Sequence, residues 1–263
     1  MLRALTLAFA LVATASAAQA GPRYVSMGSS YAAGLGIAPY QEGTPARCAR
    51  STRNYASQLA AKRGLSLVDV GCSGARTSAI LQPWGELPAQ IDAVTADTAL
   101  VTITIGGNDI GLVGGLYGGS CRQLGEANCA PQSAPTEADY AALEAAMTGI
   151  VKAIRARAPK AEVVLVEYPT ILPPTGACAA TPLADADAQA ARTKAARLLT
   201  ATRAAATAGR AAVITTSEFG RGHDACAAEP WMNGYPAPGA APYHPNLAAM
   251  TAIAEALDAV LPR

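Results

Sequence analysis

The sequence has few histidines and few charged residues, and each scarcity excludes a class of function. The 263 residues include only two histidines, and the six cysteines form no Cys-x-x-Cys pair. The ligand spacing of a zinc site is therefore missing, and we expect no bound metal. Charged residues make up 15% of the chain and nearly balance, with 20 Lys and Arg against 19 Asp and Glu. This balance gives no electrostatic basis for binding nucleic acid or an anionic membrane surface.

The first 20 residues have the composition of an export signal. Arg3 gives a basic start, a mostly apolar run covers 4–13, and a small-x-small cleavage pattern covers 18–20. The run is short for a bilayer span, and no later segment is long and apolar enough to be one. We therefore predict a signal peptide over 1–20 and one catalytic domain over 21–263, secreted to an extracellular or periplasmic space. An uncleaved N-terminal membrane anchor is the alternative.

All six cysteines lie in the predicted mature chain, and export leads to an oxidising compartment. An even number of cysteines there favours disulfides, although six cysteines allow fifteen pairings. Fewer bridges with some free buried thiols are the alternative. Proximity along the chain favours sequential pairs: Cys48 with Cys72, Cys121 with Cys129, and Cys178 with Cys226.

Short β-branched runs alternate with alanine-rich helical patterns along the mature chain. This alternation predicts βαβ units, and hence an α/β domain with a parallel sheet covered by helices on both faces. The expected strands cover 23–27, 65–70, 100–105, 162–167 and 211–215. The expected helices cover 54–63, 136–158, 185–208 and 247–260, and loops are expected over 111–135, 169–182 and 220–245.

Polar, glycine-bearing segments follow each of the first three expected strands. They are 28–31 (GSSY), 71–75 (GCSGA) and 106–109 (GGND). A fourth polar segment, 242–246 (PYHPN), directly precedes the last expected helix. Because ligands bind beyond the carboxyl ends of the strands of a parallel sheet, we expect these segments to meet in one crevice.

These segments contain the groups that acyl transfer requires: an exposed hydroxyl, a nearby base and donors for the developing oxyanion. Ser30 on a tight turn can supply the hydroxyl, and His244 can supply the base. The main-chain N–H groups of Ser30 and Gly74 and the side-chain amide of Asn108 can supply the donors. Asn108 and its neighbour Asp109 could instead cap a turn or a helix. The combination predicts a serine hydrolase that needs no metal or organic cofactor.

The order of the segments resembles the SGNH hydrolase superfamily, also called the GDSL esterases and lipases. The resemblance spans nearly the whole mature chain. It extends to secreted actinobacterial-type esterases, lipases and phospholipases, because 222–226 (GHDAC) and 230–231 (PW) match stretches common in them. It implies a flavodoxin-like three-layer α/β/α fold with a five-stranded parallel sheet, and three sequential disulfides. It also implies Ser30 as nucleophile, His244 as base and an oxyanion hole from Ser30, Gly74 and Asn108.

Two positions depart from the family's pattern. The Asp before the nucleophile is Ser29 here, which makes Ser29 an alternative nucleophile. The acid three residues before the histidine is replaced by Ala241. Some similar secreted members use a main-chain carbonyl near this position, so we expect a Ser–His dyad in which the Ala241 carbonyl orients the imidazole. A carboxylate from another loop, Asp109 or Asp224, is the alternative orienter, and His223 is the alternative base.

The resulting prediction is a monomeric esterase or lipase that acts on a small-molecule or lipid ester through an acyl-enzyme on Ser30. A phospholipase A-type activity, a carbohydrate deacetylase and a non-catalytic binding module are the alternatives. An α/β-hydrolase is disfavoured because no Gly-x-Ser-x-Gly pentapeptide occurs. Activity is expected to fall at acidic pH as His244 becomes protonated, with a reference histidine pKa of about 6.5.

Overall fold

The computed structural model describes residues 21–262, so the expected signal peptide over 1–20 lies outside the described residues. The described chain contains a five-stranded sheet in the order β2-β1-β3-β4-β5, in which every neighbouring pair is parallel. Each strand begins and ends within two residues of its expected range, so the strand predictions are confirmed. The strands are β1 (Arg23–Gly28), β2 (Ser66–Asp69), β3 (Thr98–Thr104), β4 (Glu162–Val166) and β5 (Ala212–Ile214).

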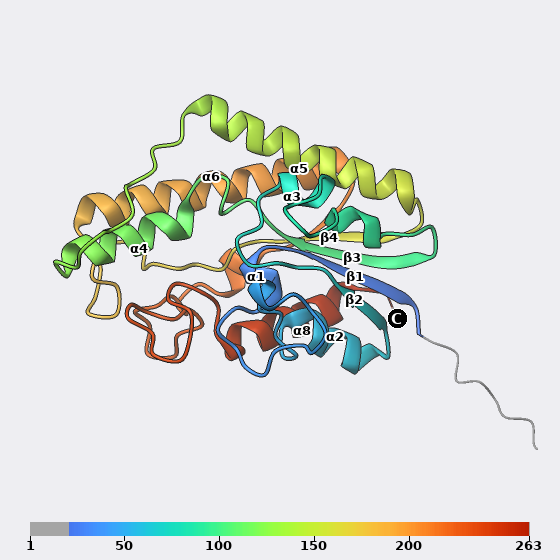
Figure 1. The fold of residues 1–263 in the computed structure, drawn as a ribbon, viewed down its shortest axis with the longest axis horizontal. Helices are drawn as coiled ribbons and strands as arrows, with labels where there is room; N and C mark the ends of the chain where they lie inside the picture. The colour runs from blue at the N-terminus through green and yellow to red at the C-terminus, as the bar shows by residue number, and fades with distance from the viewer. Residues whose placement is uncertain (1–20, 263) are drawn as a thin grey trace, which may run out of the picture.

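Helices cover both faces of the sheet and give a three-layer α/β/α fold, as expected (Figure 1). α4, α5 and α6 lie on one face, and α2 and α8 pack together on the other. The longer helices are α2 (Tyr55–Arg63), α4 (Leu112–Gln123), α5 (Glu137–Arg157), α6 (Asp185–Gly209) and α8 (Leu247–Val260). The short elements are α1 (Ser30–Ala33), η1 (Ala46–Cys48), α3 (Ser78–Leu81), η2 (Gln90–Ala93) and α7 (Thr216–Phe219).

The strands supply two separate apolar cores because successive side chains point to opposite faces of a sheet. On β1, Val25 and Met27 pack in the core beneath α5 and α6, whereas Tyr24 packs in the core beneath α2 and α8. Residues on both faces of β1 are fully buried. This strand is therefore held rigidly from both sides, and its carboxyl end is a firm base for the turn that follows.

The prediction of a loop over 111–135 is wrong for its first half, which forms α4. The segment contains four glycines, which lower its intrinsic helix propensity. Tertiary packing offsets that cost because the missing side chains let α4 approach its neighbours closely. A Cβ added at Gly119 would lie 2.7 Å from Leu183 Cδ2, and one added at Gly118 would lie 2.4 Å from the Ala130 carbonyl oxygen.

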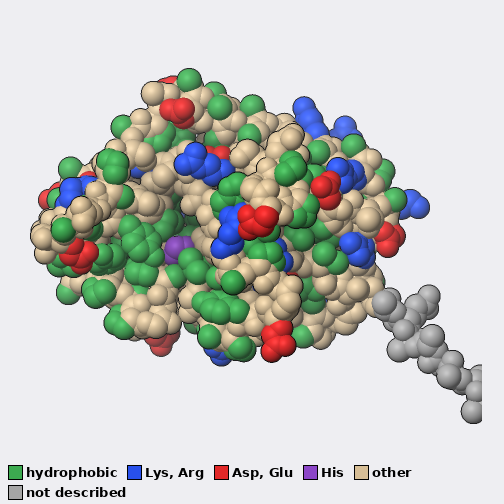
Figure 2. Space-filling view, viewed as in Figure 1, with side chains coloured by type: hydrophobic (Ala, Val, Ile, Leu, Met, Phe, Trp, Pro, Cys, Tyr) green, Lys and Arg blue, Asp and Glu red, His purple; other side chains and the backbone are tan. Residues whose placement is uncertain are grey.

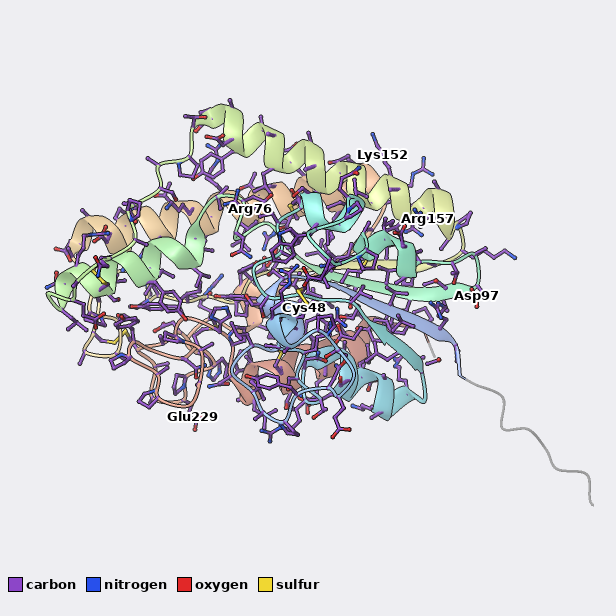
Figure 3. The ribbon with its side chains drawn as sticks, viewed as in Figure 1. Cys48, Arg76, Asp97, Lys152, Arg157 and Glu229 are labelled. Carbon is purple, nitrogen blue, oxygen red and sulfur yellow. A yellow bond between two sulfur atoms is a disulfide. The ribbon has the colours of Figure 1, made fainter. Side chains whose placement is uncertain are left out.

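Three disulfides tie loops to the fold, and their pairing is the sequential one that the sequence analysis expects. The structure joins Cys48 to Cys72, Cys121 to Cys129, and Cys178 to Cys226, and Figure 3 draws the sulfur atoms of such bonds in yellow. The third bond links the loop after β4 to the long loop before α8, across a separation of 48 residues. Over residues 21–262, no helix combines the length and hydropathy needed to cross a bilayer.

Candidate active site

Ser30 is the first residue of α1, and only Ser29 separates it from the end of β1. The turn is anchored to the next strand, because the Ser29 N–H donates to the Thr104 carbonyl over 2.9 Å. Gly28 has a φ of +132°, and a Cβ added there would lie 2.2 Å from the Thr104 oxygen, so this position requires glycine. Ser30 is 7% exposed, and its Oγ lies 2.8 Å from Nε2 of His244.

His244 lies in the loop directly before α8 and is 4% exposed. Its Nδ1 lies 2.8 Å from the Pro242 carbonyl oxygen. A carbonyl can only accept, so this contact assigns the ring proton to Nδ1 and leaves Nε2 as an acceptor for the Ser30 hydroxyl. Burial lowers the pKa of His244 to about 4, against a smaller opposing effect of the hydrogen bond to Pro242. The imidazole is therefore neutral at pH 7.

The prediction that the Ala241 carbonyl orients the imidazole is wrong by one residue, because the Pro242 carbonyl contacts the ring instead. Its oxygen accepts from the main-chain N–H of His244 over 3.3 Å and from Asn233 Nδ2 over 3.0 Å. Between Pro242 and the ring, Tyr243 has a left-handed φ of +57°. This bend turns the chain so that the carbonyl two residues before the histidine reaches the ring.

The two carboxylates considered as alternative orienters are engaged elsewhere. Asp109 accepts from the N–H of Thr77 over 3.1 Å and from its hydroxyl over 2.5 Å, and burial raises the pKa of Asp109. Asp224 accepts from the Cys226 N–H over 2.8 Å. These bonds brace loops, and both nitrogens of the His244 ring already have other partners.

The alternative nucleophile and the alternative base also have structural partners. Ser29 Oγ is fully buried and lies 2.9 Å from the Tyr168 hydroxyl. His223 Nδ1 lies 2.8 Å from the Glu229 carbonyl oxygen, and its ring stacks on Trp231 with centroids 4.3 Å apart. Ser29 therefore braces the turn toward the loop after β4, and His223 anchors its own loop.

The expected oxyanion donors follow β1, β2 and β3, which are neighbours in the sheet. Ser30 is the first residue of a helix, so its N–H has no partner within that helix. Gly74 has a φ of +84°, in the left-handed region that glycine adopts readily. Asn108 Nδ2 donates one hydrogen to the Ala75 carbonyl over 2.9 Å, and an amide nitrogen carries a second hydrogen.

Aromatic side chains support the histidine from behind. The Tyr31 ring lies 5.0 Å from the His244 ring and 4.2 Å from the Tyr168 ring, measured between centroids. Its hydroxyl donates to the Tyr243 carbonyl, and the Tyr243 hydroxyl bonds Ser120 on α4. Sequence reasoning expected Tyr31 and Tyr243 to pack around the site but could not give these hydrogen bonds, because the bonds join residues more than 100 positions apart.

A cavity of about 300 Å³ lies on the α4 and α6 side of the sheet. Tyr168 forms part of its wall and also bonds Ser29, so the cavity adjoins the nucleophile turn. Figure 2 shows hydrophobic side chains gathered around a hollow in which a histidine side chain is visible. The apolar lining comes from α4, the loop after β4 and α6, and includes Leu112, Leu116, Ile171, Leu172, Ala195 and Leu199.

A serine hydroxyl beside a neutral imidazole, at the carboxyl edge of a parallel sheet, is the arrangement of a serine hydrolase. Comparison with known proteins agrees with this class. Residues 26–252 match the GDSL-like Lipase/Acylhydrolase family. The chain belongs to this family, which confirms the resemblance to the SGNH hydrolases, and it is a carboxylic ester hydrolase.

Its relatives include lipases and a phospholipase of Streptomyces. Lipase 2 of Streptomyces coelicolor is 37% identical over 259 residues, covering 89% of this chain and 84% of that protein. The solved structure of the extracellular lipase of Streptomyces rimosus is 30% identical, with a TM-score of 0.73 over 92% of this chain and 100% of that one. Phospholipase A1 of Streptomyces albidoflavus is 27% identical, with a TM-score of 0.74 over the same shares of the two chains.

Proposed function

We propose that this protein is a secreted lipase or esterase in which Ser30 is the nucleophile and His244 the general base. One observation carries the proposal: Oγ of Ser30 lies 2.8 Å from Nε2 of His244, while Nδ1 of the same ring is held by the Pro242 carbonyl. The distance is within hydrogen-bond reach, as proton transfer from a nucleophile to its base requires.

The reaction proceeds in two halves. Ser30 Oγ attacks the ester carbonyl carbon while its proton passes to His244 Nε2, and the tetrahedral oxyanion accepts hydrogen bonds from Ser30 N–H, Gly74 N–H and Asn108 Nδ2. The intermediate collapses, and the alcohol leaves with the proton from His244. Water then attacks the acyl-enzyme with His244 again as base, which releases the carboxylic acid and restores Ser30.

This site works as a dyad. The Pro242 carbonyl fixes the ring tautomer, as a carboxylate does in a triad, but it carries no full charge to stabilise the imidazolium that forms during attack. The low pKa of His244 has the same physical origin: a buried imidazole without a carboxylate partner resists protonation.

The substrate we propose is a lipid ester. The cavity beside Tyr168 is lined mainly by apolar side chains, and its volume of about 300 Å³ suits an acyl chain better than the acetyl group of a glycan. The lipases among the relatives favour the same class. A phospholipid acyl ester is the second candidate, because one similar structure is that of a phospholipase A1.

Secretion is part of the proposal. The signal-like composition of residues 1–20 supports it, as do three disulfides and an extracellular relative. Expression of the whole chain in a secreting bacterial host should release a protein that N-terminal sequencing finds to begin at Gly21. A protein that keeps residues 1–20 and stays with the membrane would contradict this part.

The catalytic proposal is tested by hydrolysis of p-nitrophenyl acetate, butyrate and palmitate by wild type, Ser30→Ala and Ser29→Ala. We expect Ser30→Ala to lose about 10⁴- to 10⁶-fold in kcat, as removal of a serine nucleophile does elsewhere. Ser29→Ala, the matched control, keeps the nucleophile and loses about 10-fold or less through a looser turn. Equal activity of wild type and Ser30→Ala would refute the proposal. A triglyceride, a phosphatidylcholine and an acetylated xylan then distinguish the substrate classes.

A further inference from the structure

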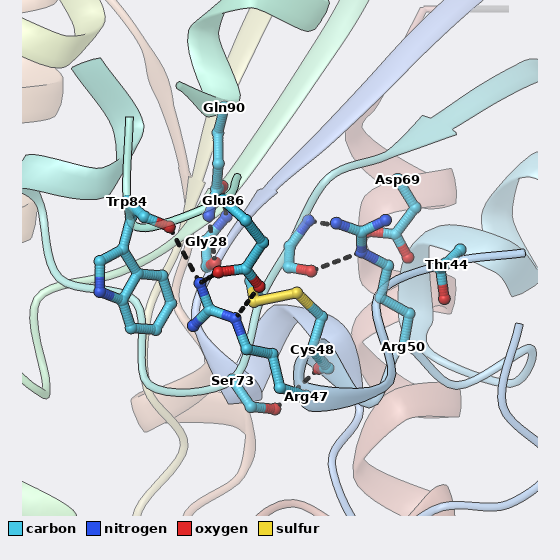
Figure 4. The surroundings of a disulfide bond; sticks show 12 residues. Gly28, Thr44, Arg47, Cys48, Arg50, Asp69, Ser73, Trp84, Glu86 and Gln90 are labelled. Carbon is cyan, nitrogen blue, oxygen red and sulfur yellow. Dashed lines mark hydrogen bonds and ion pairs between the residues drawn. A yellow bond between two sulfur atoms is a disulfide. The ribbon is translucent and has the colours of Figure 1, made fainter. Parts of the chain in front are cut away.

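A glutamine outside the four polar segments of the site holds the strand end from which the nucleophile turn begins. Gln90 lies at the start of η2 and is 6% exposed. The Gly28 N–H donates to its Oε1 over 2.7 Å, and its Nε2 donates to the Gly28 carbonyl over 3.0 Å. Figure 4 shows the side chain of Gln90 directed at Gly28 with both contacts drawn. The amide thus pairs with both polar groups of one residue, as a neighbouring strand would.

This pairing occurs where β1 leaves the sheet. The φ of +132° at Gly28 turns the chain away from the strand direction, and the buried N–H and carbonyl there still require partners. The Cys72 N–H also donates to the Gly28 carbonyl, over 3.0 Å. Gly28 is two residues before Ser30, so a rotation of this peptide would displace the nucleophile turn.

The pairing of Gln90 with Gly28 also lies beside a position at which the chain departs from its family's pattern. The Asp expected before the nucleophile is replaced by Ser29, whose side chain is directed to Tyr168 on the opposite side of the turn from β2. Two side chains therefore fix the turn: Ser29 through Tyr168, and Gln90 through the main chain of Gly28.

We infer that Gln90 is a positioning residue for ester hydrolysis, whose amide fixes the Gly28 peptide and thereby the aim of Ser30 toward His244. The inference rests on the proposed role of Ser30 as nucleophile. Gln90 acts through Gly28 and not on the substrate, so its loss should lower kcat much more than it raises KM.

The sharpest test replaces Gln90 with glutamate, which has the same shape. A protonated carboxyl can accept from the Gly28 N–H and donate to its carbonyl, as the amide does, whereas a carboxylate places a charge against that carbonyl. Burial favours the protonated form and raises the pKa of such a glutamate above its usual value of about 4.3. The defect of Gln90→Glu should therefore be large at pH 8 and smaller at pH 5.

We expect Gln90→Glu at pH 8 to lose about 10- to 100-fold in kcat, with KM within about 3-fold of wild type. Relative to wild type at the same pH, kcat should recover by at least about 5-fold between pH 8 and pH 5. Gln82→Glu is the matched control, because Gln82 is exposed in the same connection between β2 and β3. Its activity should follow wild type at every pH.

Gln90→Met, which has similar volume and no hydrogen-bonding amide, should lose kcat at all pH values without recovery at pH 5. Circular dichroism of Gln90→Glu at pH 5 and pH 8 must show the same folded state, because an ionised buried glutamate can also unfold the domain. A Gln90→Glu to wild-type ratio of kcat that stays flat from pH 5 to pH 8, or a defect confined to KM, would overturn the inference. If Gln90→Glu does not fold, a Gln90→Met enzyme with wild-type kcat would overturn it. Undiminished activity of Ser30→Ala would instead refute the underlying function, so the two failures are distinct.

Discussion

The two halves of the proposed dyad are held in different ways. Ser30 follows a strand that lies between two others and is buried on both faces. His244 lies at the end of the long loop 220–245, and an earlier segment of the same loop, around Asn233, holds it. The Asn233 N–H donates to the His244 carbonyl over 2.9 Å, the Tyr243 N–H donates to the Asn233 carbonyl over 3.0 Å, and Asn233 Nδ2 holds the Ala241 carbonyl.

This difference separates what the core fixes from what the loops fix. The place of the serine depends on β1, its neighbouring strands and the buried amide of Gln90, so in the wild type it should persist as long as the domain is folded. The place of the imidazole depends on hydrogen bonds within the loop 220–245, the Cys178–Cys226 disulfide and the aromatic contacts of Tyr31. Loops of this kind open with less free energy than core strands do. Changes on the histidine side should therefore alter activity with little effect on global stability.

Removing the imidazole is the most severe break on the histidine side. His244→Gln should lower kcat/KM about 10²- to 10⁴-fold, because a general base contributes this much. His223→Gln is the matched control; its ring stacks on Trp231 and has no contact with Ser30, so activity should stay within about 3-fold of wild type. The measurement is hydrolysis of p-nitrophenyl butyrate at pH 8. A larger loss for His223→Gln than for His244→Gln would show that His223, and not His244, is the base.

A milder break removes one support of the histidine loop. Asn233→Asp keeps the shape of the side chain and removes the donor to Ala241, so kcat should fall by about 10-fold through poorer alignment of the ring. The melting temperature should change by only a few degrees. Asn128→Asp, in an exposed loop, is the control with the same charge change. A wild-type kcat for Asn233→Asp would show that the loop holds its shape without this bond.

The pH profile of activity tests whether the imidazole is buried. Of the effects predicted here, the change in activity near neutral pH is the smallest. Because burial lowers the pKa of His244 to about 4, kcat/KM should stay nearly constant from pH 7 to pH 5 and reach half its maximum near pH 4. The sequence alone placed this fall near the reference pKa of about 6.5. A half-maximum near pH 6.5 in the wild type would mean that the ring is more hydrated in solution than its 4% exposure indicates.

The same depressed pKa has a consequence for stability, with a defined sign. The unfolded chain binds a proton at His244 below about pH 6.5, whereas the folded chain does so only near pH 4. Stability from this group is therefore complete above pH 6.5 and is lost as pH falls toward 4. Urea unfolding at pH 7 and pH 4.5 should show a smaller acid loss for His244→Gln than for wild type.

Much of the fold was predictable because its signals are local. The strands are short β-branched runs, and Thr136 with Asp139 forms the capping box that begins α5. α4 could not be predicted, because its glycines reduce local helix propensity and its reason for being helical is close packing against α6 and the segments beside it.

The site divides in the same way. Sequence reasoning can locate the short motifs at the ends of strands and before a helix. These motifs contain Ser30, Gly74, Asn108 and His244. The orienting carbonyl depends on a single left-handed residue, Tyr243, and counting back along the chain gave Ala241 instead of Pro242.

The sequence gives no signal for Gln90, because only the fold brings this glutamine from a connecting segment to Gly28.

The lining of the cavity has a consequence for how this enzyme can diversify. Along one wall of the cavity, α6 presents only small side chains at Ala191, Ala195 and Ala196. None of these residues takes part in the hydrogen bonds that align Ser30 with His244. Under the proposed function, larger residues at these positions would shorten the acceptable acyl chain and leave the proton relay untouched. Substitutions on α6 could thus change the acyl-chain specificity of the enzyme without touching the residues that carry out the reaction.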